Sequence, residues 1–207
     1  MSVAPAERPW RLFVAVPIGE ELRIGLATAV GRIRAADPER DAAFRWTDRQ
    51  GWHVTIAFLG STPADAVPRV AEAMRSAASG VEPFRLATAG LGAFPSLRRA
   101  RVIWYRILDP EGRLESVARG LRRELAIEDG GPFRAHLTLA RARAERGAAL
   151  DDGLLAAELP EGEIAVHRLV LYRSHLGRGP ATYESLAEVP FLATAAGVMA
   201  QPLATAR

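Results

Sequence analysis

Cysteine and lysine are both absent from the 207-residue sequence. The lack of cysteine excludes disulfides, a thiolate nucleophile and cysteine-ligated zinc or iron–sulfur clusters, and it makes a cytoplasmic location the simplest expectation. The lack of lysine excludes a P-loop lysine that holds nucleotide phosphates, and also a lysine that forms a Schiff base or a covalent nucleotide adduct. Binding of anions must therefore depend on arginine, histidine, serine, threonine and backbone N–H groups.

The charge of the chain is nearly balanced. All 27 basic residues are arginine and the formal net charge is +3, which does not by itself indicate nucleic-acid binding. Hydrophobic residues make up 49% of the chain, enough for one large domain or for two small lobes that share a core. The first apolar run, from Leu12 to Ile18, is short and contains Pro17, so we expect neither a signal peptide nor a membrane span.

Apolar runs alternate along the chain with amphipathic segments. The runs predict strands over residues 11–17, 44–46, 53–59, 84–89, 101–108, 133–141, 163–175 and 183–191. The amphipathic segments predict helices over residues 20–35, 62–78, 109–125 and 148–158, the second of them capped by Thr62. Because the chain has no glycine-rich phosphate turn and no regular strand–helix repeat, we expect an α+β fold rather than a doubly wound parallel sheet.

The most informative feature is a His-x-Thr pattern that occurs inside two of the predicted strands. The first copy lies in GWHVTIAFLG (residues 51–60) and the second in RAHLTLAR (residues 134–141), and a predicted helix precedes each strand. The four histidines and nine threonines of this chain would give only about 0.2 such triplets by chance. Two copies within similar apolar runs therefore indicate a shared role.

Strand geometry places the two polar residues of each copy side by side. Side chains alternate across a strand, so His53 and Thr55 face the same way, about 6.5 Å apart along the backbone. His136 and Thr138 do the same in the second copy. The opposite face of the first strand is predicted to enter the core with the residues Val54, Ile56 and Phe58.

Two such strands facing each other across a cleft would surround one small anion. Threonine hydroxyls can donate hydrogen bonds to nonbridging phosphoryl oxygens, while the two imidazoles lie on opposite sides of the phosphorus. One neutral and one protonated histidine would activate water and protonate the leaving oxygen, since an unperturbed pKa of about 6.5 makes both forms accessible near pH 7. The pattern therefore predicts in-line hydrolysis of a phosphodiester without a metal or other cofactor.

A zinc site is the competing interpretation of the two histidines. Hydroxyls are poor zinc ligands, and neither copy supplies the His-x-x-x-His or glutamate spacing of common hydrolytic zinc sites. We therefore predict that His53 and His136 act as an acid and a base rather than as metal ligands.

These segments resemble the 2H phosphoesterases, and within them the bacterial and archaeal RNA 2′,3′-cyclic phosphodiesterases once called 2′-5′ RNA ligases. HVTIAFLG and HLTLAR are similar to the two His-x-Thr-x signatures, and RLFVAVP is similar to the first strand of the family. The resemblance implies a bilobal α+β fold. Two lobes of antiparallel sheet would be related by a pseudo-twofold axis, with helices on the outside and both motifs in a central cleft.

The resemblance also implies the extent of the domain. A single bilobal domain would cover residues 1–192, with the first motif at residues 53–56 and the second at residues 136–139. The alanine-rich end, residues 193–207, has no periodic pattern, and we expect it to be a loose tail.

The same resemblance implies a reaction and roles for the four motif residues. The reaction opens a terminal 2′,3′-cyclic phosphate of RNA to a 2′-phosphate. His53 matches the family histidine assigned as proton donor and His136 the one assigned as proton acceptor. Thr55 and Thr138 match the phosphate-binding threonines. From the residues alone the two histidine roles cannot be distinguished, because the repeat is nearly symmetric.

Two arginines beside the second motif are candidates for substrate binding. Arg134 lies on the same strand face as His136 if the side chains alternate regularly. Arg141 follows the motif as in the family, but strict alternation would turn it away from His136, so the strand must end or twist there. Trp46 and Trp52, before the first motif, are predicted to pack rather than to stack on bases.

Several functions stay open at the level of the sequence. The expected partner is an RNA end or a small nucleotide that bears a 2′,3′-cyclic phosphate, bound by a monomer that does not associate with membranes. The same site could instead join or cleave a 2′-5′ linkage, or act on a small cyclic nucleotide, because a site for one phosphate says little about the groups attached to it. A noncatalytic RNA-binding module is a third alternative, against which the two retained imidazoles argue.

Overall fold

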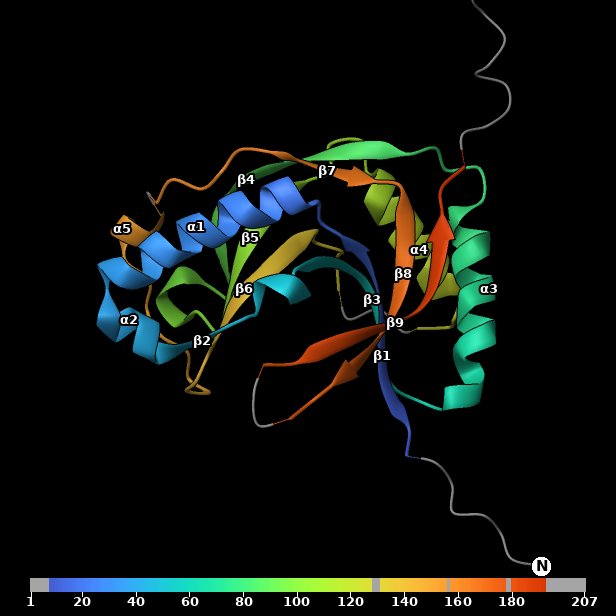
Figure 1. Ribbon diagram of the computed structural model, residues 1–207, viewed down its shortest axis with the longest axis horizontal. Coiled ribbons are helices and arrows are strands. Elements are labelled where there is room, and N and C mark those ends of the chain that lie inside the picture. The colour runs from blue at the N-terminus through green and yellow to red at the C-terminus, as the bar shows by residue number, and fades with distance from the viewer. Residues whose placement is uncertain (1–7, 128–130, 156, 178–179, 193–207) are drawn as a thin grey trace, which may run out of the picture.

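One antiparallel sheet of nine strands organises the chain (Figure 1). The computed structural model describes residues 8–127, 131–155, 157–177 and 180–192, and the tail predicted from residue 193 lies outside them. The strands are β1 (Trp10–Pro17), β2 (Phe44–Trp46), β3 (His53–Thr62), β4 (Phe84–Phe94), β5 (Val102–Leu108), β6 (His136–Ala142), β7 (Glu163–Val166), β8 (Arg168–His175) and β9 (Thr182–Pro190). Their order is β7-β4-β5-β6-β3-β1-β8-β9, and β2 pairs with β6 beside this path.

The helices lie outside the sheet, which confirms the predicted α+β class. They are α1 (Glu20–Ala36), α2 (Pro38–Ala43), α3 (Val67–Ala78), α4 (Arg113–Glu124) and α5 (Asp152–Leu155). In Figure 1, α1 and α2 lie together on the left, while α3 and α4 pack against each other on the right, where α3 contacts β8 and β9 and α4 contacts β3. None of the helices in the described ranges is long and apolar enough to cross a membrane.

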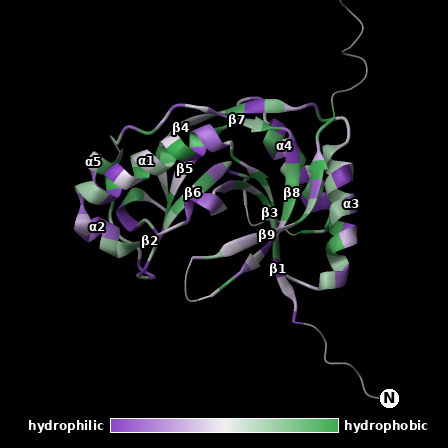
Figure 2. Ribbon diagram, viewed as in Figure 1, coloured by the Kyte–Doolittle hydropathy of each residue, from purple (hydrophilic) through white to green (hydrophobic). Residues whose placement is uncertain are grey.

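The helices bury the stripes that the sequence pattern predicted. Figure 2 shows α1 and α3 as alternating apolar and polar patches, which is typical of helices with one face in a core. The buried positions of α1 include Leu22, Leu26, Val30 and Ile33, which recur at helical spacing along one face. Acidic residues in its first turn and Arg34 in its last turn also suit the helix dipole.

The two halves of the sheet have the same plan. The units β1–α1–β3 and β5–α4–β6 each place a helix between two neighbouring antiparallel strands, and the second strand carries a His-x-Thr motif. β3 and β6 meet at the centre, where Val54 pairs with Leu137. From this junction β6-β5-β4-β7 extend to one side and β3-β1-β8-β9 to the other. The two predicted lobes are therefore the halves of one continuous sheet.

A one-residue bulge occurs at the same point of both motif strands. In each half, two consecutive residues of the neighbouring strand pair with motif-strand residues that are two positions apart. At this point the residues passed over are Ile56 in β3 and Leu139 in β6, and β3 has a second such shift at Leu59. Because a bulge inserts one extra residue, the alternation of side chains shifts by one position beyond it.

The bulge in β3 makes one prediction about the core wrong. Val54 and Ile56 are buried as predicted, but Phe58 is 57% exposed and Ala57 is buried in its place. The extra residue at Ile56 reverses the alternation, so Phe58 returns to the face that carries His53.

The segment predicted as one strand over residues 163–175 is broken at His167 into β7 and β8. β7 pairs with β4 at one edge of the sheet, whereas β8 pairs with β1 and β9 near the other edge. A chain that crosses from one edge to the other at a single residue requires a sheet curled until its edges approach. Figure 1 shows this curl, with β7 and β8 next to each other at the top.

Other predicted boundaries also differ, among them the following. Thr62 does not cap a helix: it ends β3, and its hydroxyl donates to the carbonyls of Leu59 and Gly60, while α3 begins at Val67. β4 runs past its predicted end to Phe94. The last predicted helix is reduced to the short α5.

Gly92 provides a test of the packing in the second half. It pairs with Trp104 on the neighbouring strand, and a Cβ at Gly92 would overlap the indole ring. Overpacking of this kind costs about 1–3 kcal/mol, so Gly92→Ala should lower the free energy of unfolding by that amount in a urea titration. Gly31 is the matched control, since it is exposed within α1 and a Cβ there meets nothing within 4 Å.

Replacing that helical glycine removes backbone freedom from the unfolded chain, so Gly31→Ala should raise the free energy of unfolding by about 0.5–1 kcal/mol. Equal and small effects of the two substitutions would contradict the described contact between Gly92 and Trp104.

Candidate active site

The junction of β3 and β6 brings the two motifs together. Val54 and Leu137, the paired residues, are fully buried, so the residues on either side of them point to the opposite face of the sheet. In this register each histidine lies across from the threonine of the other motif. We call this surface the motif face, and its four defining residues are His53, Thr55, His136 and Thr138.

Electrostatic coupling shows that the two histidines share one site with a third group. The charge of His136 lowers the pKa of His53, and Arg141 lowers the pKa of both histidines. The three groups are therefore close together, and a negatively charged ligand between the two histidines would meet the positive charge of Arg141.

Each histidine is held by the backbone two residues before it. Nδ1 of His53 lies 2.6 Å from the carbonyl oxygen of Gly51, and Nδ1 of His136 lies 2.7 Å from that of Arg134. Since a carbonyl only accepts, each Nδ1 must carry a proton and donate it. This fixes the neutral tautomer of both rings and leaves Nε2 as the atom available to a substrate.

Burial makes both histidines weak bases in the free protein. Burial is the main cause that lowers the pKa of His53 to about 4; His136 and Arg141 act in the same direction, and the bond to Gly51 opposes them. The pKa of His136 is also lowered, mainly by burial and further by Arg141, against the bond to Arg134. The ordinary pKa expected from the sequence is therefore wrong for these rings, and both are neutral at pH 7.

Aromatic side chains account for the burial of His53. Phe13 stacks on its ring with a centroid distance of 4.7 Å, and Tyr183 meets it edge-on at 5.2 Å. Tyr172 stacks in turn on Phe13 at 5.3 Å. Gly51 allows this arrangement, because a Cβ there would lie 2.7 Å from the Tyr183 ring. The aromatic cluster therefore both fixes the ring of His53 and removes water from it.

His136 has a smaller aromatic surround on its own half of the sheet. Phe94 meets it edge-on at 5.1 Å and Trp104 at 6.0 Å, and these two rings stack on each other. The two histidines thus have equivalent backbone bonds but unequal surroundings.

Arg141 lies on the motif face because of the bulge in β6. Leu139 and Ala140 are both buried, and Arg141 is exposed. The bulge supplies the change of direction that the sequence pattern required for Arg141 to face His136. Arg141 also lowers the pKa of Tyr183, against a larger rise from burial, so its charge is felt on both halves of the site.

Arg134 contributes its backbone to the site. It lies in the segment before β6, and its carbonyl is the group that holds His136. Its side chain is exposed and makes no hydrogen bond or ion pair within the ranges that the structure describes.

The loop before β3 is fixed to the second motif strand. The hydroxyl of Thr47 lies within hydrogen-bond distance of the carbonyls of Thr138 and Leu139, and the backbone N–H of Thr47 also donates to Leu139. Trp52 is buried, as predicted, and its Nε1 donates to the Thr47 hydroxyl. The loop that enters the first motif is thereby anchored on the second.

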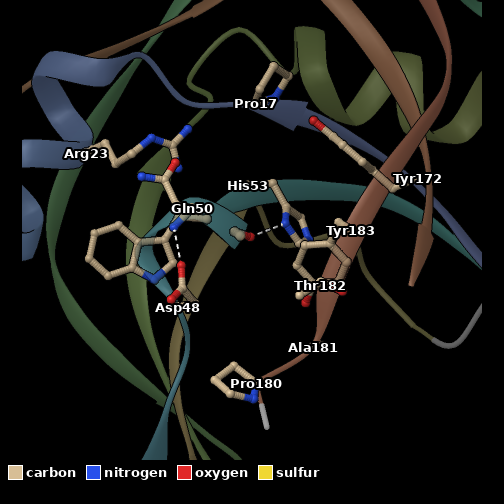
Figure 3. A pocket seen from close by; sticks show the side chains of 12 residues that line it. Pro17, Arg23, Asp48, Gln50, His53, Tyr172, Pro180, Ala181, Thr182 and Tyr183 are labelled. Carbon is tan, nitrogen blue, oxygen red and sulfur yellow. Dashed lines mark hydrogen bonds between the residues drawn. The ribbon is translucent and has the colours of Figure 1, made fainter. Parts of the chain in front are cut away.

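A hollow of about 340 Å³ adjoins His53 (Figure 3). It lies between the loop before β3, the start of α1 and the strands β8 and β9, and its volume is in the range of small-ligand sites. Arg23, Asp48, Gln50 and Thr182 supply its polar side chains. In Figure 3, the rings of His53 and Tyr183 lie next to each other, and both line this hollow.

No group of three or more His, Cys, Asp or Glu side chains that could hold a metal occurs in the described part of the chain.

Sequence reasoning missed several residues around the motif face. Phe58 was misplaced because regular alternation does not foresee a bulge. Tyr183 and the hollow depend on strands that lie far apart in the sequence, so local patterns do not locate them.

The pKa of His53 is directly testable by NMR. Its imidazole should titrate with a midpoint near 4 in the free protein, below the ordinary value of about 6.5. Because the folded-state pKa is depressed, neutral His53 contributes stability above pH 6.5, and this contribution is lost as the pH falls towards 4. Bound phosphate should raise the midpoint, since an anion stabilises imidazolium. A midpoint of 6.5 or higher without ligand would contradict the described burial.

Comparison with known proteins shows which family this chain is similar to. The family described as LigT-like phosphoesterases matches residues 16–104. Proteins named RNA 2′,3′-cyclic phosphodiesterase are similar over more of the chain. The one from Methanothermobacter thermautotrophicus is 30% identical over 139 residues, 66% of this chain and 73% of that protein. The one from Thermus thermophilus is 34% identical over 144 residues, 65% of this chain and 69% of that protein.

A longer relative of the same name occurs in Geobacillus stearothermophilus. It is 29% identical over 188 residues, which is 87% of this chain. The chain spans 57% of the length of that relative.

Solved structures are similar over the described fold. A protein from Thermus thermophilus superimposes with a TM-score of 0.69 and 27% identity, covering 87% of this chain and 97% of that protein. E. coli LigT in complex with 3′-AMP superimposes with a TM-score of 0.67 and 27% identity, covering 88% and 98%. The curled antiparallel sheet with outer helices is therefore common to these proteins and to this chain.

Proposed function

The chain belongs to the LigT-like phosphoesterases of the 2H superfamily, and from this membership we propose that it is an RNA 2′,3′-cyclic phosphodiesterase. The observation that carries the proposal is the paired presentation of His53 and His136. They lie on neighbouring strands, each with Nδ1 bonded to the carbonyl two residues earlier. The names of the relatives support the substrate class.

In the proposed mechanism, Thr55 and Thr138 donate hydrogen bonds to the nonbridging oxygens of the cyclic phosphate. Nε2 of His136 accepts a proton from the attacking water, and the imidazolium of His53 gives a proton to the leaving 3′-oxygen. The bond from phosphorus to the 3′-oxygen breaks as the bond to the water oxygen forms, so the product carries a 2′-phosphate. Arg141 balances the negative charge that develops on phosphorus.

The lowered pKa of His53 determines when the catalytic proton arrives. At pH 7 the free ring is neutral, so the substrate anion must raise the pKa of His53 as it binds. Once formed, the imidazolium can give its proton to the leaving oxygen. Proton uptake would thus accompany substrate binding.

The surroundings of the motif face suit a nucleic-acid end. Phe58 is exposed on this face and offers a surface on which a base can stack. Arg134, exposed next to the second motif, is a further candidate for substrate contact. The proposal includes a monomer acting in the cytoplasm, with residues 1–192 as one domain, because both halves of the sheet supply the site.

Alanine substitution tests the two histidines. His53→Ala and His136→Ala should each lower kcat for a 2′,3′-cyclic phosphate substrate about 10²-fold to 10⁴-fold, because each removes one proton-transfer group. His167→Ala is the matched control, since this exposed histidine lies at the break between β7 and β8. Activity should also persist in a metal chelator.

Thermal unfolding of the same variants would show that the fold is retained. Near-wild-type turnover by both variants, or a strict need for added divalent metal, would contradict the two-histidine mechanism.

Product analysis tests the reaction itself. An oligoribonucleotide that ends in a 2′,3′-cyclic phosphate should be converted to one with a 2′-phosphate, a position that ³¹P NMR distinguishes from the 3′-phosphate. A joined 2′-5′ product would instead identify a ligase. Binding that weakens steeply with salt, without turnover, would identify an RNA-binding module.

A further inference from the structure

Two arginines lie opposite each other at one end of the motif face. Arg45 on β2 and Arg141 on β6 are direct register partners, and such partners on antiparallel strands project from the same face of a sheet. Both residues are exposed. Like charges in this position destabilise a sheet, so the free protein maintains the pair at a cost to its own stability.

The burial pattern of β2 shows independently that Arg45 points to the motif face. Its neighbour Phe44 is buried, and Trp46 lies under the guanidinium of Arg34 from α1, at 5.8 Å. Both neighbours therefore occupy the helix-covered side, and alternation directs Arg45 to the other side, where Arg141 lies.

No carboxylate neutralises this pair within the described ranges. Other arginines of the same region are paired with acids: Arg34 lies 2.6 Å from Asp41, and Arg40 lies 2.9 Å from Asp151. Neither Arg45 nor Arg141 has an ion-pair partner or a side-chain hydrogen bond among the described residues. Two uncompensated guanidinium groups on one face form a site for an anion rather than an internal contact.

The pair marks only one end of the motif face. The pseudo-twofold counterpart of Arg141 is Phe58, because each is the second residue after the bulge of its own strand. The arginine pair therefore has no equivalent at the corresponding position of β3, where an aromatic ring takes the place of a guanidinium.

The hollow beside His53 is a poorer location for a second phosphate. Asp48 lines it and makes no ion pair within the described residues, and its carboxylate would repel a phosphate group. The arginine pair carries no such opposing charge.

We propose that Arg45 and Arg141 form a second phosphate site, which binds the 5′-phosphate of the nucleotide whose 2′,3′-cyclic phosphate lies between the two motifs. This inference rests on the proposed function and specifies its substrate class as the end of an RNA chain rather than a nucleoside cyclic phosphate. The backbone of Arg141 lies three residues beyond that of Thr138, about 10 Å along the strand. Its long side chain can therefore lie between the two phosphates and contact both, while Arg45 contacts only the second one.

Two small substrates that differ by one phosphate test the site. Adenosine 2′,3′-cyclic phosphate lacks the 5′-phosphate, and its 5′-phosphorylated form carries it. The wild-type protein should show a kcat/KM about tenfold higher for the phosphorylated form, as expected for charge-assisted hydrogen bonds. Arg45→Gln should bring this ratio close to one, and Arg45→Lys should retain part of it.

Arg69→Gln is the matched control. Arg69 is an exposed arginine of α3 and has no ion-pair partner within the described ranges. This substitution removes the same unit of charge from a different surface, so it should leave both the ratio and the turnover unchanged. Thermal unfolding should show that Arg45→Gln is at least as stable as the wild type, because it relieves a like-charge pair.

A binding measurement separates this inference from the proposed function. Calorimetry with adenosine 2′-monophosphate and adenosine 2′,5′-bisphosphate should give about tenfold tighter binding of the bisphosphate by the wild type and no preference in Arg45→Gln. If neither cyclic substrate is hydrolysed but the binding preference holds, the proposed reaction fails and the second phosphate site stands. If hydrolysis occurs but the preference is absent, or persists in Arg45→Gln, the second phosphate site is overturned.

Discussion

The pairing of Val54 with Leu137 is the contact on which the site depends. It is the single register pair between β3 and β6 in the described part of the chain, so the two halves of the sheet join there and diverge beyond it. Because only this pair among the described residues joins the two motif strands, the motifs lie side by side there and the strands separate beyond them. β2 and the anchored Thr47 occupy part of the space that opens along β6.

Burial and charge act in opposite directions at the motif face. The stack of Phe13 and Tyr172 and the edge of Tyr183 hold His53 in one orientation, but the same contacts remove the water that would stabilise its imidazolium. Arg141 adds positive charge and strengthens that effect. The free protein therefore has two oriented, neutral rings in a positive field, an arrangement completed by an anionic ligand.

Much of the fold and of the motif face could be predicted from local sequence patterns. Alternation and helical stripes located most elements, and the repeat located His53, Thr55, His136 and Thr138. The bulges could not be foreseen, because an extra residue in a strand is decided by pairing with its neighbour rather than by its own side chains. The break at His167 was hidden for a similar reason: both pieces are apolar and continue without a turn residue. Tyr183 reaches His53 only through the final order of the strands.

The strand order also means that the two halves of the sheet are completed at different stages of synthesis. The half that contains β4, β5, β6 and β7 is one uninterrupted segment, residues 84–166, whereas the other half is built from β1 and β3 before it and from β8 and β9 after it. During synthesis from the N-terminus, the surroundings of His136 can assemble from contiguous chain. His53 must wait for Tyr172 and Tyr183, which emerge last. The first motif thus gains its aromatic surroundings only when the final strands dock. The active site can therefore function only once the fold is complete.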